Sequence, residues 1–160
     1  MPLDLLDELL SVTQALSDAG VPYAVCGGLA LGIHGHPRMT KDLDVLVHPD
    51  DVARSLALVK PLGFDVPARE MVFGLRQGKR RPVHRISKLD DEGNLLALDF
   101  LHAVEELAGV WAARESFRYQ GREIWVVTRD GLVTMKRIAG RPQDLADIAQ
   151  LEGTTDEDPT

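Results

Sequence analysis

The sequence predicts an α+β fold (α/β-like) in which a single mixed β-sheet is flanked by helices. Three patterns support it: apolar strand-like runs alternate with helical repeats, two hairpins follow, and two helical segments close the chain. The 160 residues, 44% of them hydrophobic, suffice for one domain with its own core. We expect this domain to span residues 1–152 and a disordered acidic tail to span residues 153–160.

Composition and charge narrow the classes of function. A net charge of −7 argues against general coating of nucleic acid, although a local basic patch remains compatible with it. The chain has no run of about 18 apolar residues and no basic signal-peptide opening, so we expect no membrane contact and a cytoplasmic location. Cys26 is the single cysteine; it cannot form an internal disulfide and is expected to lie in the core.

The first elements follow from spacing and stop signals. Leucines between residues 5 and 16 fall on one side of a helix that should end at Gly20. The apolar run at residues 23–26 predicts a strand, and residues 29–33 predict a short helix ended by Gly35.

Two carboxylates follow on the next predicted strand. Asp42 and Asp44 are two residues apart in an apolar run, so both project from the same face. Neighbouring carboxylates repel unless a cation lies between them, and carboxylates with substrate phosphates are usual ligands of Mg²⁺. Upstream, Gly27 and Gly28 would let the backbone turn sharply and approach a phosphate. The alternative is a surface turn and a solvated strand end.

Gly27-Gly28, thirteen intervening residues and Asp42-x-Asp44 resemble the signature of the polymerase-β-like nucleotidyltransferase superfamily. Gly-Gly-Leu-Ala-Leu and Arg-Met-Thr-Lys-Asp-Leu-Asp are similar to AbiEii toxin-type and minimal nucleotidyltransferase (MNT) proteins of prokaryotes. The resemblance implies that fold, an NTP substrate, and Mg²⁺ or Mn²⁺ as cofactor. Many members have Ser after the first glycine, where this chain has Gly28.

The loop between the glycines and the carboxylates adds two nucleotide-binding candidates. The guanidinium of Arg38 could reach a polyphosphate, the alternative being a solvated loop side chain. The resemblance adds Thr40. We do not expect His34 and His36 to ligate zinc, because the carboxylates nearby favour a hard cation.

The middle of the chain predicts a helix that begins near Pro49 and ends before Gly63, and then a strand around residues 71–75. A basic cluster follows: Arg76, Lys79, Arg80, Arg81, His84, Arg85 and Lys88. This cluster could bind a polyanionic acceptor such as tRNA, or it could be a solvated hairpin tip.

Residues 83–89 and 95–101 predict a hairpin around a polar turn. Asp99 lies within its second, nearly continuous apolar strand, where a carboxylate is costly unless it is paired or bound to a cation. It resembles the third carboxylate that the superfamily places beside the Asp-x-Asp strand. The implied role is to ligate the metal and act as general base; the alternative is a cap for a helix near Ala103.

The last segments predict a helix over residues 104–111, a hairpin around Gln120-Gly121, and helices over 132–139 and 143–151. The closing helices resemble C-terminal elements of AbiEii-type enzymes. By that resemblance Lys136 would contact the triphosphate, and Arg141 and Asp144 would brace the site. The alternative for Lys136 is a solvated helix face.

Together these features predict a metal-dependent nucleotidyltransferase, in which an acceptor hydroxyl attacks the α-phosphorus of an NTP and pyrophosphate leaves. RNA such as tRNA, a protein hydroxyl and a small molecule all remain open as acceptor, and the resemblance admits a role in a toxin–antitoxin system. A different class is also open: a nucleotide-binding or antitoxin-like module that pairs with a partner protein. The preferred NTP and the oligomeric state are not predicted.

Overall fold

The computed structural model describes residues 4–35, 42–68, 71–73 and 81–153. Its α-helices are α1 (Leu5–Asp18), α2 (Gly27–Ile33), α3 (Val52–Val59), α4 (Ala108–Ala112), α5 (Arg129–Ala139) and α6 (Pro142–Gly153). Its strands are β1 (Ala24–Cys26), β2 (Asp42–Val47), β3 (Phe64–Pro67), β4 (Met71–Phe73), β5 (Arg81–Leu89), β6 (Leu95–His102), β7 (Glu115–Tyr119) and β8 (Arg122–Val126). Short 3₁₀ turns cover Pro49–Asp51, Lys60–Leu62 and Glu105–Leu107.

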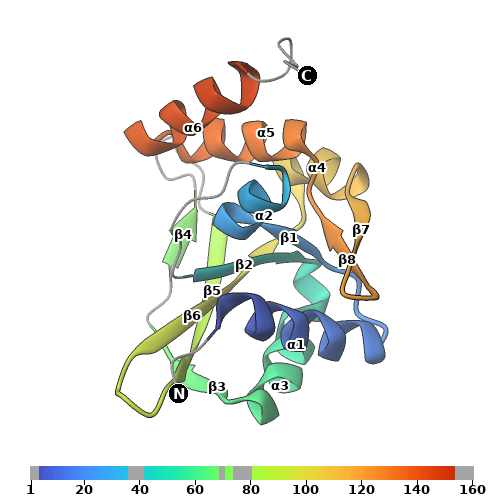
Figure 1. Ribbon diagram of the computed structural model, residues 1–160, viewed down its shortest axis with the longest axis vertical. Coiled ribbons are helices and arrows are strands. Elements are labelled where there is room, and N and C mark those ends of the chain that lie inside the picture. Colours follow the sequence, from blue (N-terminus) through green and yellow to red (C-terminus); the bar gives the residue numbers. More distant parts are fainter. Residues whose placement is uncertain (1–3, 36–41, 69–70, 74–80, 154–160) are drawn as a thin grey trace.

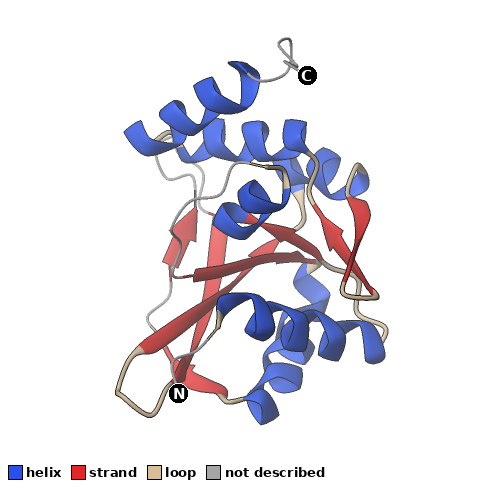
Figure 2. Ribbon diagram, viewed as in Figure 1, coloured by secondary structure: helices blue, strands red, loops and turns tan. Residues whose placement is uncertain are grey.

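The described strands form one mixed sheet, which confirms the predicted fold class. Its order is β3-β5-β6-β2-β1-β8-β7, and β4 pairs with β5. The central strands β2 and β6 run parallel, whereas β2 is antiparallel to β1 and β6 is antiparallel to β5. Helices α1 and α3 lie toward one end of the molecule and α5 and α6 toward the other, with the sheet between them (Figures 1 and 2).

Burial explains why these segments are strands and helices. Six consecutive residues of β6, from 96 to 101, are buried, because helices or neighbouring strands cover the strand on all sides. The leucines of α1 point inward as their spacing predicted, and the helix is capped by the Asp4 carboxylate, which accepts the N–H groups of Leu6 and Asp7. No described helix is long and apolar enough to cross a membrane.

Several predicted boundaries shift by a turn. Helix α2 begins at Gly27 and not at residue 29, because Gly27, at φ +68°, joins the end of β1 directly to the helix. Helix α5 begins at Arg129, three residues earlier than expected, because the Thr128 hydroxyl caps it by accepting the Gly131 N–H. The predicted tail at residues 153–160 lies almost wholly outside the described residues, so it stays a prediction.

Candidate active site

Four polar side chains form a row across the adjacent strands β5, β6, β2 and β1. Arg85 of β5 is the register partner of Asp99 of β6, Asp99 is the partner of Asp44 of β2, and Asp44 is the partner of Cys26 of β1. Residues directly opposite one another in a sheet project from the same face, with Cβ atoms about 5 Å apart. The row therefore runs as guanidinium, carboxylate, carboxylate and thiol. Asp42 projects beside it, two residues before Asp44.

The buried carboxylate of Asp99 has a partner, as its place in an apolar strand predicted. It is 5% exposed and accepts two hydrogen bonds from Arg85, from Nε at 2.8 Å and from NH2 at 3.0 Å. The same Arg85 NH2 lies 3.5 Å from Oδ2 of Asp42. The 3₁₀ turn that follows β6 has Val104 at its N-cap position, so the alternative role of Asp99 as a helix cap is wrong.

Gly27 is required by the Asp44 carboxylate. A Cβ added at residue 27 would lie 2.1 Å from Oδ2 and 2.8 Å from Cγ of Asp44. The backbone there is also left-handed, a conformation that glycine adopts without penalty. The predicted pairing of the glycines with the carboxylates is thus a direct packing contact. Gly28 lies in the first turn of α2, one residue further on.

Charge is concentrated at this row. Burial, and next the charges of Asp99 and Asp42, raise the pKa of Asp44 to about 7, while Arg85 acts in the opposite direction. The hydrogen bond to Asp99 raises the pKa of Arg85. Burial, followed by the charges of Asp44 and Asp99, raises the pKa of the Cys26 thiol well above its usual value. Cys26 is buried in the core as predicted, and its thiol is not activated.

Helices α5 and α6 place a second set of charges beside the row. Nζ of Lys136 lies 2.9 Å from Oδ2 of Asp147 and 3.8 Å from Oδ1 of Asp144. Its side chain is 11% exposed, so the alternative of a solvated helix face is wrong. The charge of Lys136 acts on the pKa of Cys26, which shows that the ammonium lies near the row.

Arg141 and Asp144, which the resemblance places together at the site, form an ion pair with each other. The Arg141 side chain donates from Nε at 2.6 Å and from NH2 at 3.2 Å, and its backbone N–H donates at 3.1 Å. Burial alone would raise the pKa of Asp144, but the bonds to Arg141 outweigh it and the pKa is lowered. The hydrogen bond to Asp144 is the main cause of the raised pKa of Arg141, and the charge of Asp44 adds to it.

The remaining predicted residues divide into two groups. Arg38 and Thr40 lie outside the described residues, and their assignment stays a prediction. The predicted basic cluster is not a single surface in the part that the structure describes. Arg85 pairs with the carboxylates, whereas Lys88 pairs with Glu8 at 2.8 Å and lies over the Phe64 ring.

Arg85 is the functional residue that sequence reasoning placed wrongly. It was grouped with basic residues that could bind a polyanion, yet it lies among the carboxylates. The register of the predicted hairpin could have placed Arg85 correctly. If Leu89 pairs with Leu95 beside the turn, then Arg85 pairs with Asp99, four residues further from the turn on each strand.

The donor set suits a hard divalent cation. Asp42, Asp44 and Asp99 supply carboxylate oxygens only, and the pKa of Asp44 is raised by burial first and next by the charges of the other two. Within the described residues, however, no three acidic, histidine or cysteine side chains already converge as a metal centre. The guanidinium of Arg85 lies between two of the carboxylates instead.

Several solved structures share this architecture. TM1012 of Thermotoga maritima, assigned as a nucleotidyltransferase, superposes with a TM-score of 0.65 at 13% identity, over 93% of this chain and 92% of that chain. The fold is the nucleotidyltransferase fold. The lincosamide adenylyltransferase LnuA, solved with lincomycin, gives a TM-score of 0.60 at 14% identity, over 93% of this chain and 97% of that one. ANT(2″)-Ia, solved with adenylyl-2″-tobramycin, gives 0.62 at 15% identity, over 94% and 88%.

The likeness to these nucleotidyltransferases lies in the fold. No family model matches the sequence, and no curated protein matches it. The resemblance to AbiEii-type and minimal nucleotidyltransferases therefore stays a prediction from the motifs.

Proposed function

We propose that the protein is a metal-dependent nucleotidyltransferase that moves an NMP from an NTP to an acceptor hydroxyl and releases pyrophosphate. The observation that carries this proposal is the register of β2 and β6, which brings Asp44 and Asp99 side by side with Asp42 next to them. Bound Mg²⁺ or Mn²⁺ would supply charge neutralisation for the α-phosphate during displacement. Asp42, Asp44 and Asp99 are the residues that would hold it.

Each residue of the chain has a separate part in this reaction. Asp99 would accept the proton of the acceptor hydroxyl, because it lies at the buried end of the carboxylate group and is fixed by two hydrogen bonds. Gly27 would let the backbone at the start of α2 lie against the Asp44 carboxylate. Lys136 and Arg141 would face the triphosphate from α5 and α6.

The fold neighbours support a small-molecule acceptor. LnuA is described with lincomycin and ANT(2″)-Ia with an adenylylated tobramycin, so small hydroxyl-bearing molecules reach the site of this fold. Arg85 and Lys88 are each paired with a carboxylate, so these two cations of the predicted basic cluster contribute less to an RNA surface. We therefore place a small-molecule hydroxyl first, ahead of tRNA or a partner protein.

A nucleotide-binding or antitoxin-like module is the second candidate, favoured by one observation. Both oxygens of Asp99 accept hydrogen bonds from Arg85, which is an unfavourable state for a general base. The two candidates differ in whether Asp99 matters for turnover.

Replacement of Asp99 separates them. We expect Asp99→Asn to bind Mg-NTP within a few fold of the unmodified protein but to lose at least about 100-fold in transfer of label from α-labelled NTP. Asp50→Asn, the same change at an exposed carboxylate on a 3₁₀ turn, is the matched control and should leave both unchanged.

Binding is measured by calorimetry with each of the four NTPs, with and without Mg²⁺, and transfer is assayed with aminoglycoside, lincosamide and tRNA acceptors. Equal transfer by Asp99→Asn would remove its role as a base. NTP binding without transfer to any acceptor or to the protein itself would favour the binding module.

A further inference from the structure

We propose that Arg85 is the internal counter-ion of the carboxylates in the metal-free protein, and that a divalent metal ion must displace its guanidinium from Asp99. This inference rests on the proposed function for the identity of the site. It goes beyond it by assigning a positioning and gating role to a residue outside the glycine and Asp-x-Asp motifs. The expected consequence is that Arg85 lowers the affinity of the site for metal.

Geometry places the guanidinium where a cation is needed. Its Nε and NH2 bind the two oxygens of Asp99 at 2.8 and 3.0 Å, and NH2 also lies 3.5 Å from Asp42. A planar guanidinium that bridges two carboxylates in this way neutralises charge as well as fixing orientation. Asp44 lies in the same row; burial, and next the charges of Asp99 and Asp42, raise its pKa, and Arg85 acts in the opposite direction.

The guanidinium holds the Asp99 carboxylate that a metal ion would need. No three candidate ligands in the described ranges converge on one point, although three carboxylates lie on adjacent positions of β2 and β6. Both oxygens of Asp99 accept hydrogen bonds from Arg85, so an ion that binds Asp99 together with Asp42 and Asp44 competes with the guanidinium for the same oxygens. A divalent ion at these carboxylates would also repel a guanidinium a few Å away.

Arg85 has a route out of the site. Its side chain is 28% exposed, whereas that of Asp99 is 7% exposed, and the Asp42 side chain on the same side is 43% exposed. The guanidinium can therefore rotate toward solvent without repacking the core, and Asp99 stays in place because β6 is fixed between β2 and β5.

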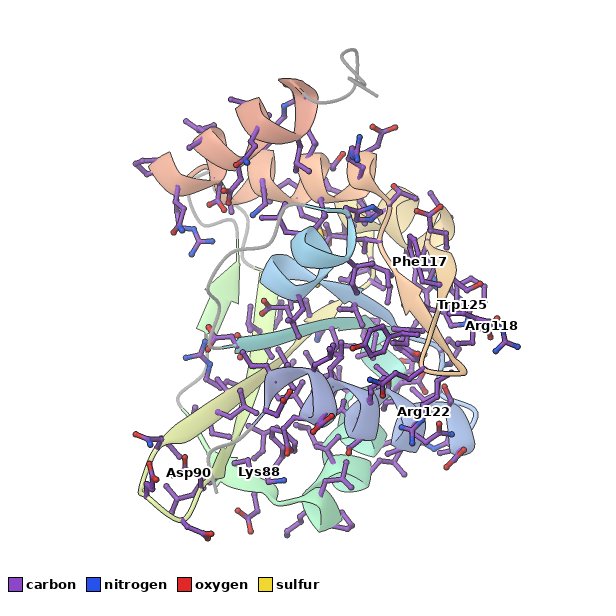
Figure 3. The ribbon with its side chains drawn as sticks, viewed as in Figure 1. Lys88, Asp90, Phe117, Arg118, Arg122 and Trp125 are labelled. Atoms are coloured by element: carbon purple, nitrogen blue, oxygen red, sulfur yellow. The ribbon has the colours of Figure 1, made fainter. Side chains whose placement is uncertain are left out.

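Metal affinity tests the proposal directly. We expect Arg85→Gln to bind Mn²⁺ alone at least about tenfold more tightly than the unmodified protein in a titration followed by electron paramagnetic resonance. Lys88→Gln is the matched control. It removes the same charge from the same strand, but Lys88 lies toward the turn end of β5 (Figure 3) and pairs with Glu8. Its affinity should be unchanged. Equal or weaker Mn²⁺ binding by Arg85→Gln would overturn the proposal.

A second measurement uses the unmodified protein, so it does not depend on how Arg85→Gln folds. The Nε–H of Arg85, which donates to Asp99, should give a nuclear magnetic resonance signal that moves when Mg²⁺ saturates the site. A signal that stays in place at saturation would also overturn the proposal. If Arg85→Gln binds Mn²⁺ more tightly and no protein in the series transfers a nucleotide, the gating role stands and the proposed function fails.

Discussion

At the scale of single residues, the carboxylate site depends on the lack of a side chain at Gly27. Gly27 has a left-handed backbone, and the space where its side chain would be is filled by the Asp44 carboxylate. Gly20 has nearly the same backbone angle, φ +72° against +68°, but nothing lies within 4 Å of its missing Cβ. Comparison of the two glycines therefore distinguishes the energetic cost of the left-handed backbone from the cost of a clash with Asp44.

Replacement of Gly20 and of Gly27 by alanine measures these two costs. Gly20→Ala should lower the free energy of unfolding by about 1 kcal/mol, the usual penalty of a left-handed alanine. Gly27→Ala should lower it by about 2–4 kcal/mol, because overpacking against Asp44 adds to the same penalty. Urea denaturation of both variants is the measurement. Equal losses would mean that Asp44 moves aside freely and that the contact is not tight.

At the scale of secondary structure, the β5–β6 hairpin shows what could and could not be predicted. Its strands followed from two apolar runs and its turn from the polar residues between them, whereas the place of Asp99 beside the Asp-x-Asp strand was implied by the resemblance to the superfamily. The role of Arg85 did not follow from either, because composition groups it with its basic neighbours and only cross-strand register assigns it to Asp99. The two C-terminal helices were predicted from the sequence. The burial of Lys136 was not, because it depends on how α6 packs on α5.

The same hairpin carries a pair of histidines that should make stability depend on pH. Nε2 of His84 lies 2.9 Å from Nε2 of His102, and burial, followed by the charge of His84, lowers the pKa of His102. The unfolded chain then binds a proton more readily than the folded protein. Stability from this group is complete above about pH 6.5 and is lost as the pH falls below that value.

Replacement of His102 should therefore flatten the pH dependence. Between pH 7 and pH 5 we expect His102→Gln to lose less unfolding free energy than the unmodified protein, measured by urea denaturation at half-unit steps. His48→Gln, at an exposed histidine outside this pair, should keep the original slope. Parallel slopes for all three proteins would show that the pair does not titrate across folding.

At the scale of the whole molecule, the carboxylate row opposes folding while it serves the site. The pKa of Asp44 is raised from 3.8 to about 7, so the folded protein holds this proton more tightly than the unfolded chain. Stability from this group is present near pH 4 and falls as the pH rises toward 7. Functional sites commonly reduce stability in this way.

Asp44→Asn should remove the loss of stability that the charged Asp44 causes at neutral and higher pH. In metal-free buffer at pH 8 we expect it to raise the free energy of unfolding by on the order of 2 kcal/mol, a discounted value because the side chain is partly exposed to solvent. Near pH 4 the gain should disappear, because Asp44 is then neutral in the folded protein. Denaturation at the two pH values measures it, and a gain of the same size at both would assign the effect to packing and not to charge.

The pairing of β2 with β6 bears on the order in which the molecule folds. The β5–β6 hairpin closes a short loop, whereas the parallel contact of β2 with β6 joins segments far apart in the chain. The hairpin is thus expected to form first, and it brings Arg85 to Asp99 before either meets Asp44. The strand that carries the third carboxylate then docks on β2 with its negative charge already balanced, so the chain never has to bring three bare carboxylates together.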